Sequence, residues 1–281
     1  MTRRADAHIH LFQPGFVAVL PESCRRVQPD EVTLYRALSE RHGVARALVV
    51  CFEGEPWAAG NNDYVARRAA EHSWMHPVAF VDAPQTLDTA TLESWGAAGF
   101  VGVSMYLFAE STDSMLRDVA DEVWSWLEQR HWLVSINSRG ETWLAWNPVL
   151  ERYPELTLLV SHLGLPRAVA TPPSAEIARR ELNSVCALAR FPAVHVKLSG
   201  FYALAEPGYA FPHEAAWPYV QVLQEAFGTE RLVWGSDFSP SLEWLSFPQT
   251  FGVFTAMPFL TNADSERIEG ENLLSLLDRV S

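Results

Sequence analysis

Eight short apolar runs, separated by longer stretches with helical spacing, constrain the fold of this 281-residue chain most strongly. Runs such as ARALVV and LTLLV are almost continuously apolar, as strands are when a parallel sheet is buried on both faces. The predicted strands are Ala5–Leu11, Ala45–Cys51, Pro77–Val81, Val101–Leu107, Leu133–Ser138, Thr157–Leu163, Val194–Gly200 and Leu232–Phe238. Because they alternate with helices, the sequence predicts an α/β protein of eight strand–helix units.

The intervening stretches carry apolar residues three and four positions apart, the spacing of amphipathic helices. The clearest predicted helices are Asp113–Arg130, Glu176–Arg190, Glu214–Phe227 and Asp264–Leu277. Such a chain can close into a (β/α)8 TIM barrel or form an open doubly wound sheet. An open sheet usually has a Gly-rich phosphate loop after its first strand, and this sequence has none there. We therefore expect residues 1–281 to form a single TIM-barrel domain.

Charge and composition exclude several kinds of partner. The formal net charge is −13, and an acidic surface repels nucleic-acid backbones and anionic lipids, so we expect neither as a partner. No apolar run approaches the roughly 20 residues that span a bilayer. The N-terminus lacks the apolar segment of a signal peptide. The widely spaced Cys24, Cys51 and Cys186 fit reduced thiols, so we expect a cytoplasmic protein.

Two histidines near the end of the first predicted strand are the first candidate site residues. Because side chains alternate along a strand, His8 and His10 should face the same side together with Asp6. Ala5, Ala7 and Ile9 should face the other side, toward the helices. Two imidazoles at positions i and i+2 can reach one metal ion. An H-x-H motif alone is a weak indication, because a buried histidine also occurs as an ordinary core residue.

Two more predicted strands end in residues that carry chemistry. The sixth ends at His162 and the eighth at Asp237. In a barrel the loops after the strands form the catalytic face, and the eighth strand neighbours the first, so both side chains should lie near His8 and His10. Alternatively, Asp237 caps a helix and His162 is a core residue. The combination on three strand ends favours an active site.

The loops after the strands also indicate what the site binds. They are rich in aromatic residues, which predict either a pocket with aromatic walls or ordinary loop packing: Trp57, Tyr202, Tyr209, Phe211, Trp244 and Phe247. Arg139 and Arg167 follow the fifth and sixth strands, and arginine binds carboxylates through two parallel hydrogen bonds. If both face the barrel mouth, the substrate is a small anionic molecule; otherwise they are surface residues.

Five motifs follow one another at barrel-like spacing: DAHIH (Asp6–His10), VSHLGLP (Val160–Pro166), VKLSG (Val196–Gly200), VWGSD (Val233–Asp237) and GENLLSLL (Gly270–Leu277). Together they resemble the amidohydrolase-related group, called amidohydrolase 2, of the amidohydrolase superfamily. That group contains lactonases of the 2-pyrone-4,6-dicarboxylate and sugar-lactone types, and decarboxylases of the aminocarboxymuconate-semialdehyde type. The resemblance is specific for the superfamily and not for the substrate.

The resemblance implies a role for each candidate residue. His8, His10 and Asp237 would bind a metal, Asp237 would take the proton of the attacking water, and His162 would polarise the carbonyl. We expect a further set of residues, at or just after strand ends, to contact the substrate: Tyr106, Asn137, Arg139 and Ser199.

The sequence departs from the group's pattern in two places. Metal-dependent members carry a histidine at the end of the fifth strand, where this chain has Asn137, and an amide oxygen is a weaker zinc ligand than an imidazole. We therefore expect one divalent ion, zinc by preference, bound weakly or absent. The lysine of two-metal members is missing from the fourth strand. The single lysine, Lys197, lies on the seventh, either in a buried ion pair or against the substrate.

The sequence thus predicts a hydrolase, a lactonase by preference, in which water attacks a lactone, ester or amide carbonyl. One alternative is a metal-dependent decarboxylase that releases CO₂ without consuming water. The other is a catalytically inactive barrel that acts as a binding module, which would not need all four candidate residues. The sequence leaves a homo-oligomer open.

Overall fold

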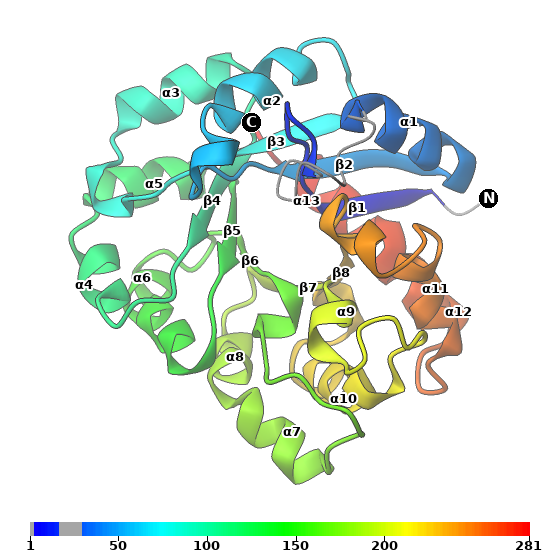
Figure 1. Ribbon diagram of the computed structural model, residues 1–281. Coiled ribbons are helices and arrows are strands. Elements are labelled where there is room, and N and C mark those ends of the chain that lie inside the picture. The colour runs from blue at the N-terminus through cyan, green and yellow to red at the C-terminus, as the bar shows by residue number, and fades with distance from the viewer. Residues whose placement is uncertain (1–2, 17–29) are drawn as a thin grey trace.

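The computed structural model describes residues 3–16 and 30–281, and within them eight parallel strands lie inside a ring of helices (Figure 1). The strands are β1 (Arg4–Ile9), β2 (Val44–Val50), β3 (Met75–Phe80), β4 (Gly102–Tyr106), β5 (Leu133–Asn137), β6 (Leu158–Val160), β7 (Val194–Leu198) and β8 (Leu232–Trp234). Each pairs with the next in sequence order. A bridge between Ile9 and Phe238 connects the two ends of the sheet. The predicted single (β/α)8 barrel is confirmed.

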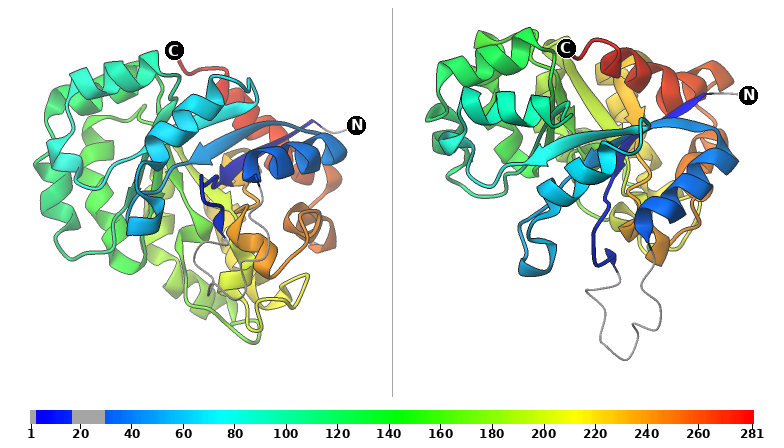
Figure 2. Two further views of the ribbon diagram at one scale, coloured as in Figure 1. Left: turned by 45° about the horizontal axis from the view of Figure 1, so that its top comes forward. Right: turned by 90° about the horizontal axis from the view of Figure 1, so that it is seen from above.

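Helices cover the outside of this barrel, as two further views show (Figure 2). They are α1 (Glu31–His42), α2 (Asn61–Ala69), α3 (Thr89–Ala97), α4 (Thr112–Arg117), α5 (Asp121–Gln129), α6 (Asn147–Arg152), α7 (Ala175–Glu181), α8 (Asn183–Ala187), α9 (Phe201–Leu204), α10 (Trp217–Phe227), α11 (Gln249–Ala256), α12 (Asn262–Glu266) and α13 (Asn272–Leu277). None of the helices in residues 3–16 and 30–281 has the length and hydropathy needed to cross a membrane.

Two of the four predicted helices are interrupted by non-helical residues, and a third, Asp264–Leu277, is α12 and α13 joined by a π-helical segment over Arg267–Glu271. The predicted helix Asp113–Arg130 is α4 and α5, because Ala120 is extended (ψ 141°) and α5 starts with two acidic residues in its first turn. Acidic side chains favour a helix N-terminus, so a new helix begins there. The predicted helix Glu176–Arg190 is α7 and α8, which end and begin at Leu182. Apolar spacing continued across both breaks and concealed them.

The first strand contains a β-bulge that changes which of its side chains face the barrel interior. Asp6 pairs with Ala47 and Ile9 with Val49, so three steps along β1 match two along β2. One extra residue reverses the alternation of side chains. The Asp6 carboxylate therefore points outward to the Tyr35 hydroxyl of α1 at 3.0 Å. The expectation that Asp6 faces the same side as His8 and His10 is wrong for this reason.

The bulge also places small residues inside the barrel. Ala5 and Ala7, expected to face the helices, pack instead with apolar residues of other strands, among them Leu48, Val50, Val78, Leu133, Leu159 and Val233. A larger core lies between the strands and the helices and includes Ile9. The interior layer fills the barrel below His8, so the site is confined to the end where the strands finish.

Glu31, the first residue of α1, connects the loops after the first and last strands. Its side chain is buried, with 2% of the residue exposed. One carboxylate oxygen accepts from the Phe12 amide at 2.7 Å. The other accepts from the Phe16 amide at 2.7 Å and from Ser239 Oγ at 2.6 Å. Burial raises the pKa of Glu31, and these three hydrogen bonds oppose that rise.

Candidate active site

The four residues expected to carry chemistry come together at the carboxyl ends of β1, β6 and β8. His8 Nε2 lies 3.1 Å from His10 Nε2. Asp237 Oδ1 lies 3.8 Å from His8 Nε2 and 3.7 Å from His10 Nε2. The His162 ring is 4.6 Å from the His8 ring, centre to centre. Potential ligand atoms of His8, His162 and Asp237 all lie within 4.8 Å of one another. The bulge in β1 leaves His8 and His10 on the interior face.

Each imidazole has a neighbour at its second ring nitrogen. His10 Nδ1 lies 2.7 Å from the Val50 carbonyl oxygen, which can only accept, so the proton of this ring is on Nδ1 and Nε2 offers a lone pair. His162 Nδ1 lies 3.0 Å from Ser199 Oγ. Burial lowers the pKa of all three histidines, which favours neutral rings that can bind a metal or a substrate.

The single lysine lies behind the site rather than at its mouth. Lys197 is fully buried, donates to Ser135 Oγ at 2.6 Å and lies 3.2 Å from His8 Nδ1. No carboxylate in the described ranges forms an ion pair with it, so the buried ion pair considered from the sequence is not formed. Burial lowers the pKa of Lys197 to about 7, while the charge of Asp237 opposes that shift.

Asp237 has a partner that sequence reasoning did not place in the site. The Tyr202 hydroxyl donates to Asp237 Oδ2 at 2.6 Å. Burial, and then the charge of Asp237, raises the pKa of Tyr202 far above its ordinary value, so the hydroxyl remains a donor. The sequence indicates Tyr202 only as an aromatic residue of the pocket wall. Its position just after the VKLSG motif was a usable signal, because loops after strands reach the mouth.

The expected substrate contacts divide into buried and exposed residues. Asn137 ends β5 and is 2% exposed, and its Nδ2 atom is buried without a hydrogen-bond partner in the described structure. Tyr106, its pairing partner on β4, is half-buried, and Ser199 is buried beside His162. Arg139 and Arg167 are both exposed, and neither forms an ion pair with a described residue. The structure brings neither guanidinium into contact with the four central residues.

The aromatic residues of the loops contribute unequally to the expected walls. The Trp57 ring packs against Phe12 at 4.7 Å, and Phe12 stacks on His10 at 5.8 Å. Tyr202 stacks on Trp244 with ring centres 6.3 Å apart. Phe247 is different: it is 2% exposed and packs against Tyr35 and Trp234, so it belongs to the core. Tyr209 and Phe211 are exposed on the loop after α9.

A model of the amidohydrolase family matches residues 5–278. The chain belongs to the amidohydrolase family. It is 28% identical over 263 residues to an L-fucono-1,5-lactonase of Burkholderia ambifaria, an alignment that covers 86% of this chain and 82% of the relative.

Solved structures share the fold of this amidohydrolase. A zinc-bound amidohydrolase from Burkholderia multivorans superposes with a TM-score of 0.78 at 16% identity, covering 98% of this chain and 99% of that one. A putative 2-pyrone-4,6-dicarboxylic acid hydrolase from Pseudomonas putida gives a TM-score of 0.72 at 21% identity, with 99% and 98% covered.

The donor atoms of this amidohydrolase are compatible with one divalent ion. Ligand atoms about 2.05 Å from a tetrahedral zinc lie about 3.3 Å from one another. The observed separations of 3.1, 3.7 and 3.8 Å among His8, His10 and Asp237 bracket that value. His10 is oriented by a backbone carbonyl, as ligand histidines usually are, whereas His8 faces a lysine amine. The cluster can therefore hold one ion, but the orientation of His8 is less well fixed for that role than the orientation of His10.

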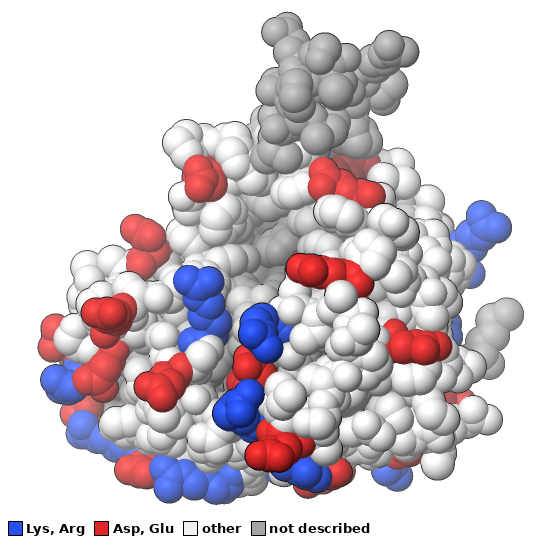
Figure 3. Space-filling view, turned by 60° about the horizontal axis from the view of Figure 1, so that its bottom comes forward, with Lys and Arg blue, Asp and Glu red and all other residues white. Residues whose placement is uncertain are grey.

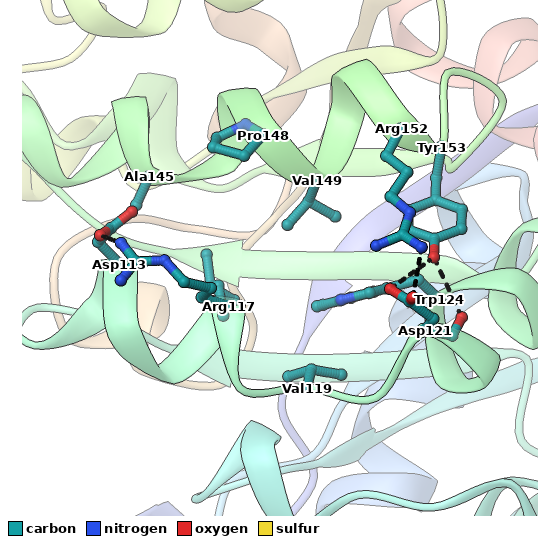
Figure 4. Close-up of a pocket in the computed structure, with 11 residues that line it drawn as sticks. Asp113, Arg117, Val119, Asp121, Trp124, Ala145, Pro148, Val149, Arg152 and Tyr153 are labelled. Atoms are coloured by element: carbon teal, nitrogen blue, oxygen red, sulfur yellow. Dashed lines mark hydrogen bonds and ion pairs between the residues drawn. The ribbon is translucent and has the colours of Figure 1, made fainter.

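A depression on the outer wall of the amidohydrolase is lined by charged side chains that are paired. This depression of about 120 Å³ lies between α4, α5 and α6 (Figure 4). Its charged side chains pair with each other, Arg117 with Asp113 and Arg152 with Asp121. The face in Figure 3 is hollowed near its middle, and basic and acidic side chains mix around the hollow without a patch of one sign. Among the described residues, the candidate catalytic side chains therefore lie at the strand ends.

Proposed function

We propose that this chain is a lactonase, which hydrolyses a small lactone with Asp237 as the general base. One observation carries the proposal: a carboxylate oxygen, Asp237 Oδ1, faces His8 and His10 within 4 Å at the end of a barrel. A water bound in this cluster lies within reach of both a base and imidazole groups. The similarity to an L-fucono-1,5-lactonase supports a lactone as the substrate.

In the proposed reaction, Asp237 transfers the proton and His162 stabilises the oxyanion. A water gives a proton to Asp237 Oδ1, and its oxygen attacks the carbonyl carbon while the carbonyl π electrons move to the carbonyl oxygen. When the Ser199 hydroxyl donates to His162 Nδ1, the neutral ring carries its proton on Nε2, which can donate to that oxyanion. The intermediate then collapses, the ring C–O bond breaks, and protonated Asp237 returns the proton to the leaving alkoxide.

A divalent ion, zinc by preference, would be held by His8, His10 and Asp237, and would supply Lewis acidity and a lower pKa for a bound water. The unpartnered Asn137 Nδ2 is available to donate to a substrate oxygen. Arg139, and Arg167 with it, would bind a negatively charged group of the substrate from the rim.

A substrate panel tests this proposal. We expect the purified protein to release acid from a member of a set that contains aldono-1,5-lactones, L-fucono-1,5-lactone among them, and 2-pyrone-4,6-dicarboxylate. A pH indicator follows ring opening, and matched esters and amides report the preference for lactones. CO₂ release from a carboxylated substrate without ring opening would favour the decarboxylase alternative instead.

We predict that each chain binds at most one divalent ion, and binds it weakly. The reason is the ligand set, which has two imidazoles and one carboxylate but an amide where a third imidazole would complete the site. Elemental analysis before and after dialysis against a chelator measures both stoichiometry and retention. Two ions per chain that survive the chelator would contradict the ligand set.

A further inference from the structure

Tyr202 separates the roles of the two carboxylate oxygens of Asp237. Oδ2 accepts a hydrogen bond from the Tyr202 hydroxyl at 2.6 Å. Oδ1 lies 3.8 Å and 3.7 Å from the Nε2 atoms of the two first-strand histidines. A separation of 2.6 Å is typical of a strong hydroxyl-to-carboxylate bond. One oxygen is therefore occupied, and the other faces the position where water would react.

The position of Tyr202 is set by the chain around it. Gly200, immediately before α9, has a φ of +68°, a conformation that favours glycine. The Tyr202 ring stacks on Trp244 from the loop after β8, with planes 11° apart. A Cβ at Gly208 would lie 2.6 Å from the Tyr202 carbonyl oxygen and 2.9 Å from the Trp244 ring. The loop after α9 therefore packs closely behind both aromatic residues and holds the hydroxyl in place.

The backbone of Asp237 is also held by hydrogen bonds, so only its side chain can still rotate. The Asp237 amide donates to the His8 carbonyl at 2.8 Å, and the Asp237 carbonyl accepts from the Ser241 amide at 2.9 Å. The terminal torsion of an aspartate is broad, so the plane of the carboxylate can rotate through a range of angles. A half-turn only exchanges two equivalent oxygens. The bond from Tyr202 therefore fixes the plane of the group, with one oxygen on the hydroxyl and the other directed at the imidazoles.

We propose that Tyr202 is a positioning residue that fixes the plane of the Asp237 carboxylate, so that the oxygen not bonded to the hydroxyl is directed at the attacking water. This inference rests on the proposed function, in which Asp237 is the base. The tyrosine keeps its own proton throughout, and no bond to it forms or breaks. Its effect is to restrict rotation of the carboxylate before the substrate arrives, which lowers the cost of reaching the reactive geometry.

Tyr202→Phe tests this role because it removes the hydroxyl and keeps the ring that stacks on Trp244. With L-fucono-1,5-lactone as substrate, we expect kcat to fall about 10- to 100-fold and KM to change less than about twofold. Tyr153→Phe makes the same chemical change on a tyrosine of the outer wall, whose hydroxyl also donates to a carboxylate, that of Asp121, and should keep the wild-type kcat. A wild-type kcat in Tyr202→Phe would overturn the proposal.

A double-mutant cycle separates positioning from a merely structural effect. In an Asp237→Asn background, adding Tyr202→Phe should lower kcat by no more than about twofold, because no base remains to be oriented. Independent, multiplying losses would overturn the inference. Wild-type turnover in Asp237→Asn would instead remove the base and with it the proposed function. A slow Asp237→Asn beside a normal Tyr202→Phe would remove the positioning role alone.

A measurement without substrate reports the hydrogen bond itself. In proton NMR spectra of protein with labelled tyrosine, a short bond to a carboxylate should give a hydroxyl resonance far downfield. We expect this resonance in the wild type and in Tyr153→Phe, and its loss in Tyr202→Phe. If no such resonance in the wild type depends on Tyr202, the proposed orientation of Asp237 is wrong.

Discussion

At the scale of single residues, the surroundings of Asp237 differ from those of an aspartate that caps a helix. Its carboxylate stands between a tyrosine hydroxyl and two imidazoles, whereas an aspartate that caps a helix would face backbone amides. The backbone of Asp237 has a φ of +56°, which a non-glycine residue adopts at an energetic cost. The chain thus holds the backbone at Asp237 in a left-handed conformation that most residues avoid.

We predict that Asp237→Asn lowers turnover by roughly 10²–10⁴-fold, the usual contribution of a positioned general base. The substitution preserves size and removes the charge and the ability to take a proton. Binding of a non-hydrolysable lactone analogue should change far less, and the melting temperature should stay within a few degrees. Turnover and melting temperature are measured on the same preparations. A large loss of stability with turnover preserved would indicate a structural carboxylate.

Single residues also show where sequence reasoning reached its limit. His8, His10, His162 and Asp237 could be found because strand ends meet at one face of a barrel, and the structure brings them together. Their catalytic and metal-binding roles stay predictions. The contact between Tyr202 and Asp237 depends on the turn at Gly200 and on packing against Trp244. Neither feature has a spacing rule that a sequence could reveal.

At the scale of secondary-structure elements, β4 and β5 depend on a glycine. A Cβ at Gly102 would lie 2.0 Å from the Leu133 carbonyl oxygen, so the strands can pair closely only without a side chain there. Gly99, just before β4, has a φ of +91°, and a Cβ added to it would have no atom of another residue within 4 Å beyond its chain neighbours. Gly102 is therefore required because a side chain would collide with Leu133, whereas Gly99 is favoured only because of its positive φ.

We predict that Gly102→Ala destabilises the protein by more than about 3 kcal/mol, because backbone atoms must move apart. Gly99→Ala should cost only about 1–2 kcal/mol, the penalty of a left-handed conformation. Urea unfolding of both variants measures the difference. Equal losses in the two variants would mean that the strands can separate at Gly102 without disturbing the sheet.

The secondary-structure elements also show which structural features could be predicted from the sequence. The number, order and approximate limits of the strands followed from apolar runs, because a buried parallel strand has few polar residues. The interruptions at Ala120 and Leu182 were missed because the apolar spacing continues across them. The bulge in β1 was missed because a strict alternation rule has no place for an inserted residue, and this error placed Asp6 on the wrong side.

At the scale of the whole molecule, buried histidines make the stability of the fold depend on pH. Burial lowers the pKa of His195 on β7 to about 4, while a hydrogen bond to the Ala193 carbonyl opposes the shift. The unfolded chain therefore binds a proton below about pH 6.5 that the folded chain refuses until about pH 4. The contribution of His195 is complete above pH 6.5 and is lost as the pH falls through this window.

We predict that the free energy of unfolding decreases by up to about 3 kcal/mol between pH 6.5 and pH 4 because of His195. His195→Asn keeps a donor for the Ala193 carbonyl and cannot titrate, so this part of the decrease should disappear. Urea unfolding of both proteins across the pH range measures the gap between their stability curves. Parallel curves would show that His195 titrates alike in the folded and unfolded chains.

The Glu31 carboxylate couples the loops after β1 and β8 energetically. It receives donors from both loops, from Phe12 and Phe16 on one side and from Ser239 on the other, across 208 residues of sequence. A deletion or exchange in either loop that moves its donor leaves a buried acceptor unsatisfied, at a cost of about 1–3 kcal/mol. An exchange of one loop is therefore expected to be tolerated best when the other loop, or Glu31, is changed with it.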